Sequence, residues 1–171
     1  MKISTKKICI TSIGIALYVA LSMTVKIPII GHIALDLGYV VLGVYCFCFG
    51  GVSGAIVGGC GCVIVSLITS GLFPPGWFVG NIFIGAVCGK LYERDQRDSV
   101  LAFLGGYFNF MVTILAVLIG IGVIKTAIEC LLFSIPWMVK IEKNGIAALV
   151  DIIVMMIGVL LAPRISKKVR K

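Results

Sequence analysis

The sequence predicts an all-α polytopic membrane protein, a bundle of six transmembrane helices, and composition is the main reason. Hydrophobic residues make up 60% of the 171 residues, charged residues only 13%, and the mean hydropathy is +1.17. A soluble domain of this length cannot hide so much apolar surface, whereas a bilayer solvates it from outside. A helix needs about 20 apolar residues to cross the hydrocarbon core. Six such runs use nearly the whole chain, so we expect one transmembrane domain over residues 1–171.

Apolar runs that end at polar residues, glycine or proline give the predicted spans. Their approximate ranges are 8–25, 37–49, 52–69, 77–91, 100–124 and 145–162. We expect a loop between the first two spans, and the polar sequence YERDQRDS at 92–99 is the clearest loop in the chain. Residues 126–144 mix apolar and charged side chains, which predicts a helical extension or a lid rather than a full span.

The basic residues predict the orientation of the chain. With the N-terminus inside the cell, 11 of the 15 Lys and Arg residues fall on the cytoplasmic side. This asymmetry follows the positive-inside rule and predicts that both termini are cytoplasmic. The net charge of +8 comes mostly from short clusters beside apolar runs. Such clusters are typical of topology signals and of contacts with membrane lipid, so we expect no nucleic-acid partner.

Several polar and aromatic residues fall near the predicted outer ends of the spans. Polar groups at membrane depth cost free energy, so they mark functional sites or structural pairs. Asp151 is the strongest candidate, because an unpaired carboxylate two turns below the surface is expensive. We expect these residues to line a cavity that opens outward and binds a small polar molecule. The candidate substrate-binding residues are Asp36, Tyr39, Trp77, Asn81, Asn109, Asn144 and Asp151.

Each candidate also has a structural explanation. Trp77 and Trp137 fit an interfacial aromatic belt, and Asp151 can pair with a lysine. Asn109 can line the cavity floor or bond a neighbouring helix. The lone histidine, His32, does not make a metal site, and the seven cysteines contain no C-x-x-C pair. We therefore expect no metal and no cofactor.

Small residues recur at helical spacing in three places. Such stripes let helix backbones approach closely in lipid and drive their association. A stripe that faces inward packs the bundle, whereas one that faces outward docks another membrane subunit. The stripes are Ser12, Ala16 and Ala20 on the first span, Gly50, Gly54 and Gly58 at the start of the third, and Gly85 with Gly89 on the fourth.

Motifs for phosphate binding and hydrolysis are absent from this sequence. It contains no G-x-x-x-x-G-K-[ST], G-x-S-x-G or H-E-x-x-H pattern. These motifs supply the phosphate cradle, the nucleophile and the metal ligands of common enzymes. We therefore expect a protein that is not an enzyme and that depends on partners for energy.

Three stretches of the chain resemble one known family. They are ALYVA at 16–20 with its AxxxA pattern, LDLGYVVLGVYCFCFGGVSGAIVGGCGC from residue 35, and SGLFPPGWFVGNIFIGAVCGKLYE from residue 70, together with the basic C-terminal tail. Over nearly its whole length the chain resembles the substrate-binding S components of energy-coupling factor (ECF) vitamin transporters. The resemblance implies six helices that hold a water-soluble vitamin near the outer surface of a prokaryotic cell membrane.

The resemblance also implies partners. An S component works with a transmembrane coupling subunit and two cytoplasmic ATPases, which hydrolyse ATP for uptake. By this resemblance Ser12, Ala16 and Ala20 face the coupling subunit, and residues 26–36 and 70–76 close over the substrate. Binding residues differ between members of the family, so the resemblance does not identify the vitamin.

Two alternatives stay open from the sequence. The first is a non-transporting scaffold subunit of a cell-envelope assembly complex, of the rod-shape MreD type, which needs small-residue faces but no ligand cavity. The second is a membrane-embedded enzyme or redox subunit, for which the sequence offers no convincing nucleophile or metal-ligand set.

Overall fold

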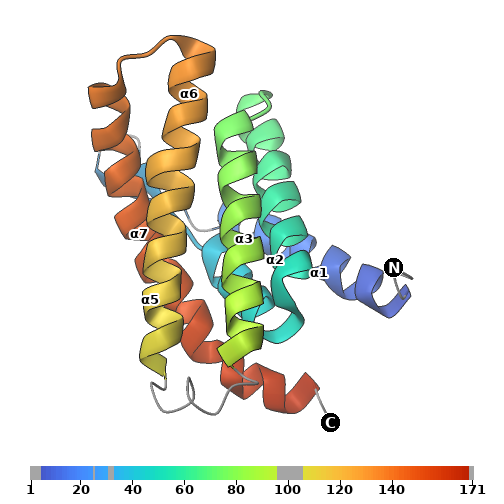
Figure 1. Ribbon diagram of the computed structural model, residues 1–171. Coiled ribbons are helices and arrows are strands. Elements are labelled where there is room, and N and C mark those ends of the chain that lie inside the picture. Colours follow the sequence, from blue (N-terminus) through green and yellow to red (C-terminus); the bar gives the residue numbers. More distant parts are fainter. Residues whose placement is uncertain (1–4, 25, 31–32, 96–105, 170–171) are drawn as a thin grey trace.

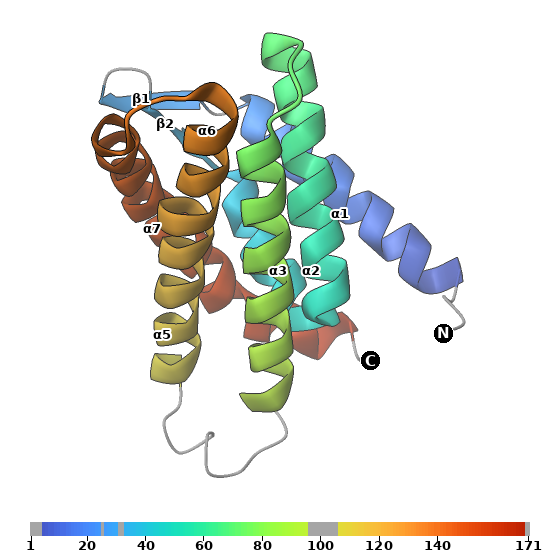
Figure 2. The same cartoon turned by 45° about the horizontal axis from the view of Figure 1, so that its top comes forward.

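The protein is a bundle of long helices (Figure 1), with a small β-hairpin at the end where α6 lies (Figure 2). The computed structural model describes residues 5–24, 26–30, 33–95 and 106–169. Within these residues, four helices are long and apolar enough to cross a membrane. The prediction of a helical membrane protein is therefore confirmed. The elements are α1 (Thr5–Thr24), β1 (Lys26–Ile30), β2 (Ile33–Asp36), α2 (Gly38–Ser70), α3 (Pro75–Asp95), α5 (Gly106–Val117), the π-helix η1 (Leu118–Lys125), α6 (Thr126–Phe133) and α7 (Trp137–Val169).

Helix α2 is a hairpin of two helical halves. The backbone leaves the helical conformation at Gly50, with φ 82° and ψ −179°. This backbone conformation is open to glycine and strained for other residues. A Cβ built on Gly54 would lie 2.6 Å from Cys46 Sγ, and one on Gly58 would lie 3.0 Å from Leu42 Cδ1. The residues on either side of Gly50 therefore face each other, and the two halves run antiparallel.

The glycine stripes of α2 and α3 pack against each other inside the bundle. A Cβ on Gly85 would lie 2.5 Å from the backbone nitrogen of Ala55, and one on Gly89 would collide with the backbone of Gly51. The two helices are thus in backbone contact along this line. These stripes hold the bundle together and are not available to a partner.

The stripe on α1 faces the other way. Ser12, Ala16 and Ala20 are all exposed, whereas Tyr18 and Ser22 on the opposite face are buried against the bundle. Towards its N-terminal end α1 leans away from α2 (Figure 2). The structure therefore leaves a small-residue face on the outside of the bundle.

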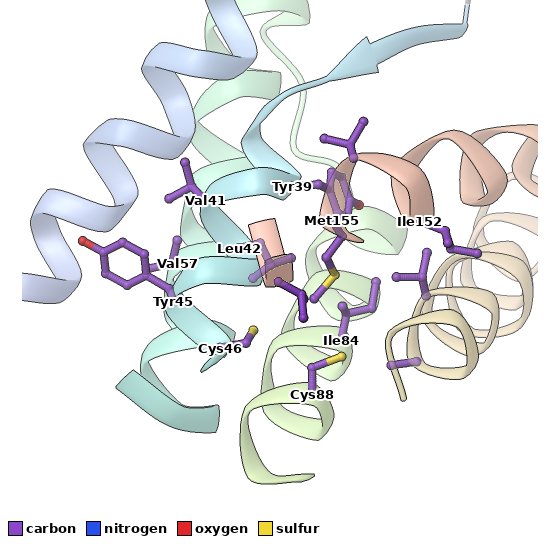
Figure 3. Close-up of a cluster of buried hydrophobic side chains, with 14 of the residues drawn as sticks. Tyr39, Val41, Leu42, Tyr45, Cys46, Val57, Ile84, Cys88, Ile152 and Met155 are labelled. Carbon is purple, nitrogen blue, oxygen red and sulfur yellow. The ribbon is translucent and has the colours of Figure 1, made fainter. Parts of the chain in front are cut away.

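Buried apolar side chains from α2, α3 and α7 fill the centre of the bundle (Figure 3). Leu42, Ile84 and Met155 are fully buried there. Gly158 on α7 allows a close approach to α2, because a Cβ at this position would collide with the backbone of Val40.

The segment between the first two helices is more regular than the expected loop. Residues 26–30 and 33–36 form an antiparallel pair in which Lys26 lies opposite Asp36 and Ile27 opposite Leu35. The pairing is irregular between Pro28 and Ile30, which fits a proline that cannot donate to the ladder. His32 lies outside the described residues.

The expected loop at 92–99 is partly helical, so that boundary was wrong. Helix α3 continues to Asp95, and Tyr92 is fully buried. Its ring lies 5.9 Å from that of Phe47, and its hydroxyl group pairs with the hydroxyl group of Thr113. Burial of this aromatic ring outweighs the polar residues that follow it. Residues 96–99 lie outside the described part of the chain.

Residues 126–144 belong to two helices. Residues 126–133 form α6, which continues the line of α5 and η1, and residues 137–144 form the first turns of α7. Ser134, between them, takes a left-handed conformation with φ 51°. The segment is therefore a helix–turn–helix tip.

We predict that Gly85→Ala destabilises the protein, because the new methyl group must push α3 away from the backbone of α2. Overpacking of this kind costs about 1–3 kcal/mol. Thermal unfolding in detergent, followed by circular dichroism, measures the effect. The matched control is Gly145→Ala on α7, where a Cβ meets nothing within 4 Å. An equal melting temperature for the two variants would contradict the close α2–α3 contact.

Candidate functional site

A buried lysine lies at the end of the bundle that carries the α6–α7 tip. Lys125 is only 4% exposed, and its Nζ lies 4.0 Å from the centre of the Trp77 ring. It donates a hydrogen bond to Asn144 Oδ1 and lies 3.5 Å from Glu129 Oε1. An aromatic face and a carboxylate together offset the cost of burying the ammonium group.

Asn144 and Glu129 extend this cluster across two helices. The amide nitrogen of Asn144 donates to Thr126 Oγ1 at 2.9 Å and to Glu129 Oε2 at 3.4 Å. Lys140 Nζ donates to the same Glu129 oxygen at 2.9 Å. The network therefore ties the end of η1 and α6 to the start of α7. The π-helical turns end at Lys125, and such segments are frequent at functional sites.

A second polar pair joins α2 to α3. The hydroxyl group of Tyr39 donates to Asn81 Oδ1 at 2.7 Å, and both residues are buried. The amide nitrogen of Asn81, which is 1% exposed, has no hydrogen-bond acceptor among the described residues. A buried donor without an acceptor costs free energy. Asn81 thus keeps hydrogen-bonding capacity that the described residues do not use.

Asp36 fixes the junction between the β-hairpin and α2. Its Oδ1 accepts hydrogen bonds from Ser22 Oγ at 2.5 Å and from the backbone nitrogen of Gly38 at 2.8 Å. The ring of Tyr18 packs beside this junction, 6.3 Å from the ring of Tyr39. Asp36 therefore links α1, β2 and α2 at the same end of the bundle.

Asp151 lies between these groups. It is 3% exposed and makes no hydrogen bond or salt bridge with the residues that the structure describes. The polar groups nearest to its carboxyl group are those of Asp36, Lys125, Tyr18 and Tyr39. An isolated buried carboxylate is costly. Lys125 offsets part of that cost from a distance, without a direct contact.

Asn109 lies away from this region. It lies in the first turn of α5, whereas Lys125 is the last residue of η1, which continues α5. The two residues are therefore at opposite ends of one continuous helical segment. The backbone oxygen of Asn109 accepts a hydrogen bond from Thr113 Oγ1 at 2.7 Å. The structure therefore brings six of the seven candidate residues to one end of the bundle and leaves Asn109 near the opposite end.

The central position of Lys125 and Thr126 in this network was not predicted from the sequence. A lysine that follows an apolar run is typical of the membrane surface, so the pattern around Lys125 does not indicate burial. The sequence feature that indicates a paired lysine is the spacing of Lys125 and Glu129, which are four residues apart and so lie on one helix face. Tyr18 and Ser22 were missed because their inward orientation depends on how α1 packs.

The polar region consists of the groups described above at this end of the bundle: Asp36, Tyr39, Trp77, Asn81, Lys125, Glu129, Asn144 and Asp151. Its composition is suited to recognition rather than to catalysis. The region offers carboxylate acceptors, an ammonium and an amide donor, and two aromatic rings. Among the described residues, no group of three or more His, Cys, Asp or Glu side chains can hold a metal ion.

Comparison with known proteins identifies the family. The model of the "ECF-type riboflavin transporter, S component" family matches residues 2–168. The chain belongs to this family. It is also similar to a UPF0397 protein of Streptococcus thermophilus strain LMD-9, with 28% identity over 91% of this chain and 86% of the relative. A UPF0397 protein of strain CNRZ 1066 is 27% identical over the same shares.

Family membership confirms the resemblance seen in the sequence. The protein is a multi-pass bacterial membrane protein and a substrate-binding subunit, not an enzyme. The family supports a general role in vitamin uptake. The scaffold and redox alternatives are therefore set aside.

We predict that Lys125→Ala lowers the stability of the protein by about 3 kcal/mol, because it breaks a buried charge pair and leaves Asn144 Oδ1 without its donor. Thermal or urea unfolding in detergent measures the loss. The control is Lys143→Ala, which removes an exposed lysine from α7. A loss no larger than that of the control would show that the cluster adds little to the fold.

Proposed function

We propose that this S component binds a water-soluble vitamin or related micronutrient with high affinity at the outer side of the membrane. The observation that carries the proposal is Asp151, a buried carboxylate without a hydrogen-bond donor among the described residues. Asn81 adds a donor without an acceptor. A ligand that supplies both complements satisfies two costly groups at once.

Riboflavin is the first substrate to test, because the matching family carries that name. Its flat ring system has both hydrogen-bond donors and acceptors, and Trp77, which is only partly buried, places an aromatic ring beside these groups. In this proposal Asp36, Tyr39, Trp77, Asn81, Asn144 and Asp151 form the site, with Lys125 and Glu129 beside them. Residues 26–36 and 70–76 close over the substrate.

In the same proposal the six predicted spans cross the membrane and both termini are cytoplasmic. The antiparallel halves of α2 support an even number of crossings. The protein delivers its substrate to a transmembrane coupling subunit driven by two cytoplasmic ATPases. The exposed stripe of Ser12, Ala16 and Ala20 supports docking of the coupling subunit on α1.

The test is a thermal-shift screen of the purified protein against riboflavin and a panel of other water-soluble vitamins. A ligand at one hundred times its Kd stabilises the native state by about 2.7 kcal/mol. We expect one clear hit. If riboflavin gives no shift and another vitamin does, the substrate assignment changes. No shift with any vitamin would contradict binding of this class.

We predict that Asp151→Asn weakens binding of that ligand by about tenfold or more, because a hydrogen bond to a charged acceptor contributes about 1.5–3 kcal/mol. Isothermal titration calorimetry in detergent measures the Kd. The control is Glu142→Gln, an exposed acid on the same helix. Equal affinity in the two variants would remove Asp151 from the site.

We also predict that tryptophan at both Ala16 and Ala20 abolishes uptake into cells and leaves the Kd of the isolated protein unchanged. The bulky rings block close approach of a partner helix. Uptake of labelled substrate and calorimetry give the two readouts. Ile153→Trp, which adds bulk to an exposed position on α7 instead of α1, is the control. If affinity falls together with uptake, this face serves the fold instead.

A further inference from the structure

A groove separates α1 from α2 and α3 at the end of the bundle where α1 begins. Its volume is about 790 Å³. The groove exists because α1 leans away from α2 in this region (Figure 2). Above the groove the hydroxyl group of Tyr45 donates a hydrogen bond to the backbone oxygen of Ile10 at 3.0 Å, which links α1 to α2.

The walls of the groove are mostly apolar. Ile8 on α1 and Val52 and Ile56 on α2 flank it, and all three are exposed. Small residues, among them Ala55 and Ala86, keep the space open. Because these helices belong to a membrane protein, apolar walls of this kind face lipid rather than water.

Two lysines stand at the groove, one from each side. Lys7 lies on α1 and Lys90 on α3, both exposed, and neither forms an ion pair with a described residue. One carboxylate, that of Glu93, also lines the groove, and it packs against the turn at Gly50. The residues that line the groove therefore carry two positive charges and one negative charge, next to its apolar walls.

We propose that this groove binds an anionic phospholipid, with an acyl chain between α1 and α2 and the phosphate group between Lys7 and Lys90. Basic pockets between membrane helices commonly hold anionic headgroups. The long lysine side chains reach the headgroup while their methylene groups stay on the apolar wall. The proposal depends on the membrane location of the protein and not on which vitamin it carries.

The test uses the full-length protein, equilibrated in detergent with equal amounts of phosphatidylglycerol and phosphatidylcholine and then analysed by native mass spectrometry. We expect preferential retention of phosphatidylglycerol. The double variant Lys7→Gln with Lys90→Gln should lose about fivefold of this preference for each lysine. The matched control, Lys6→Gln with Arg164→Gln, removes two exposed charges that do not line the groove and should keep the preference.

A second variant tests the position of the acyl chain. Ala55→Phe fills the groove and should lower retention of both lipids. Circular dichroism confirms that the variant is folded. Equal retention of the two lipids by the unmodified protein would overturn the proposal, as would full retention of phosphatidylglycerol by Ala55→Phe. Protection of Lys7 and Lys90 from chemical labelling by the coupling subunit, with no lipid retained, would show that the groove is a protein interface.

Discussion

The close approach of α2 and α3 is the contact on which the rest of this bundle depends. Helices in lipid gain little from hydrophobic attraction, so they associate where small residues allow their backbones to touch. Gly85 and Gly89 of α3 meet the backbone of α2 at Gly51 and Ala55. With these helices held together, the Tyr39 hydroxyl group reaches Asn81 across them, and Trp77 is carried to the position where its ring covers Lys125. The glycine contact therefore positions the polar region as well as the core.

The polar region combines two kinds of buried group. Lys125, Glu129 and Asn144 satisfy one another and tie the α6–α7 tip together. Asp151 and the Asn81 amide keep hydrogen-bonding capacity that the described residues do not use. The first kind fixes the positions of the helices around the polar region, and the second kind leaves hydrogen-bonding groups that the proposed ligand would satisfy. Rigid support beside unsatisfied groups is what a preorganised binding site requires.

Much of this could be predicted from the sequence. Hydropathy gave the helical membrane class, and the combination of AxxxA with the glycine-rich second stretch gave the family. The direction of each stripe could not be predicted, because Ser12 and Gly54 look alike until the packing of α1 and α2 is known. Tyr92 was misplaced because the charged residues after it were taken to mark a loop, and the burial of Lys125 was not predicted. The partners that bury them, Trp77 and Phe47, lie more than 40 residues away in the sequence.

The turn at Gly50 has a consequence for how the chain enters the membrane. The first half of α2, residues 38–49, is about 18 Å long at 1.5 Å per residue, much shorter than the hydrocarbon core of about 30 Å. A transmembrane helix usually needs about 17–25 residues, so this half is too short to cross the hydrocarbon core without its partner. No loop separates this half from the second half, because the chain turns at Gly50 alone. We therefore expect the two halves to enter the membrane together as one hairpin, so that a charged substitution in one half also affects the other.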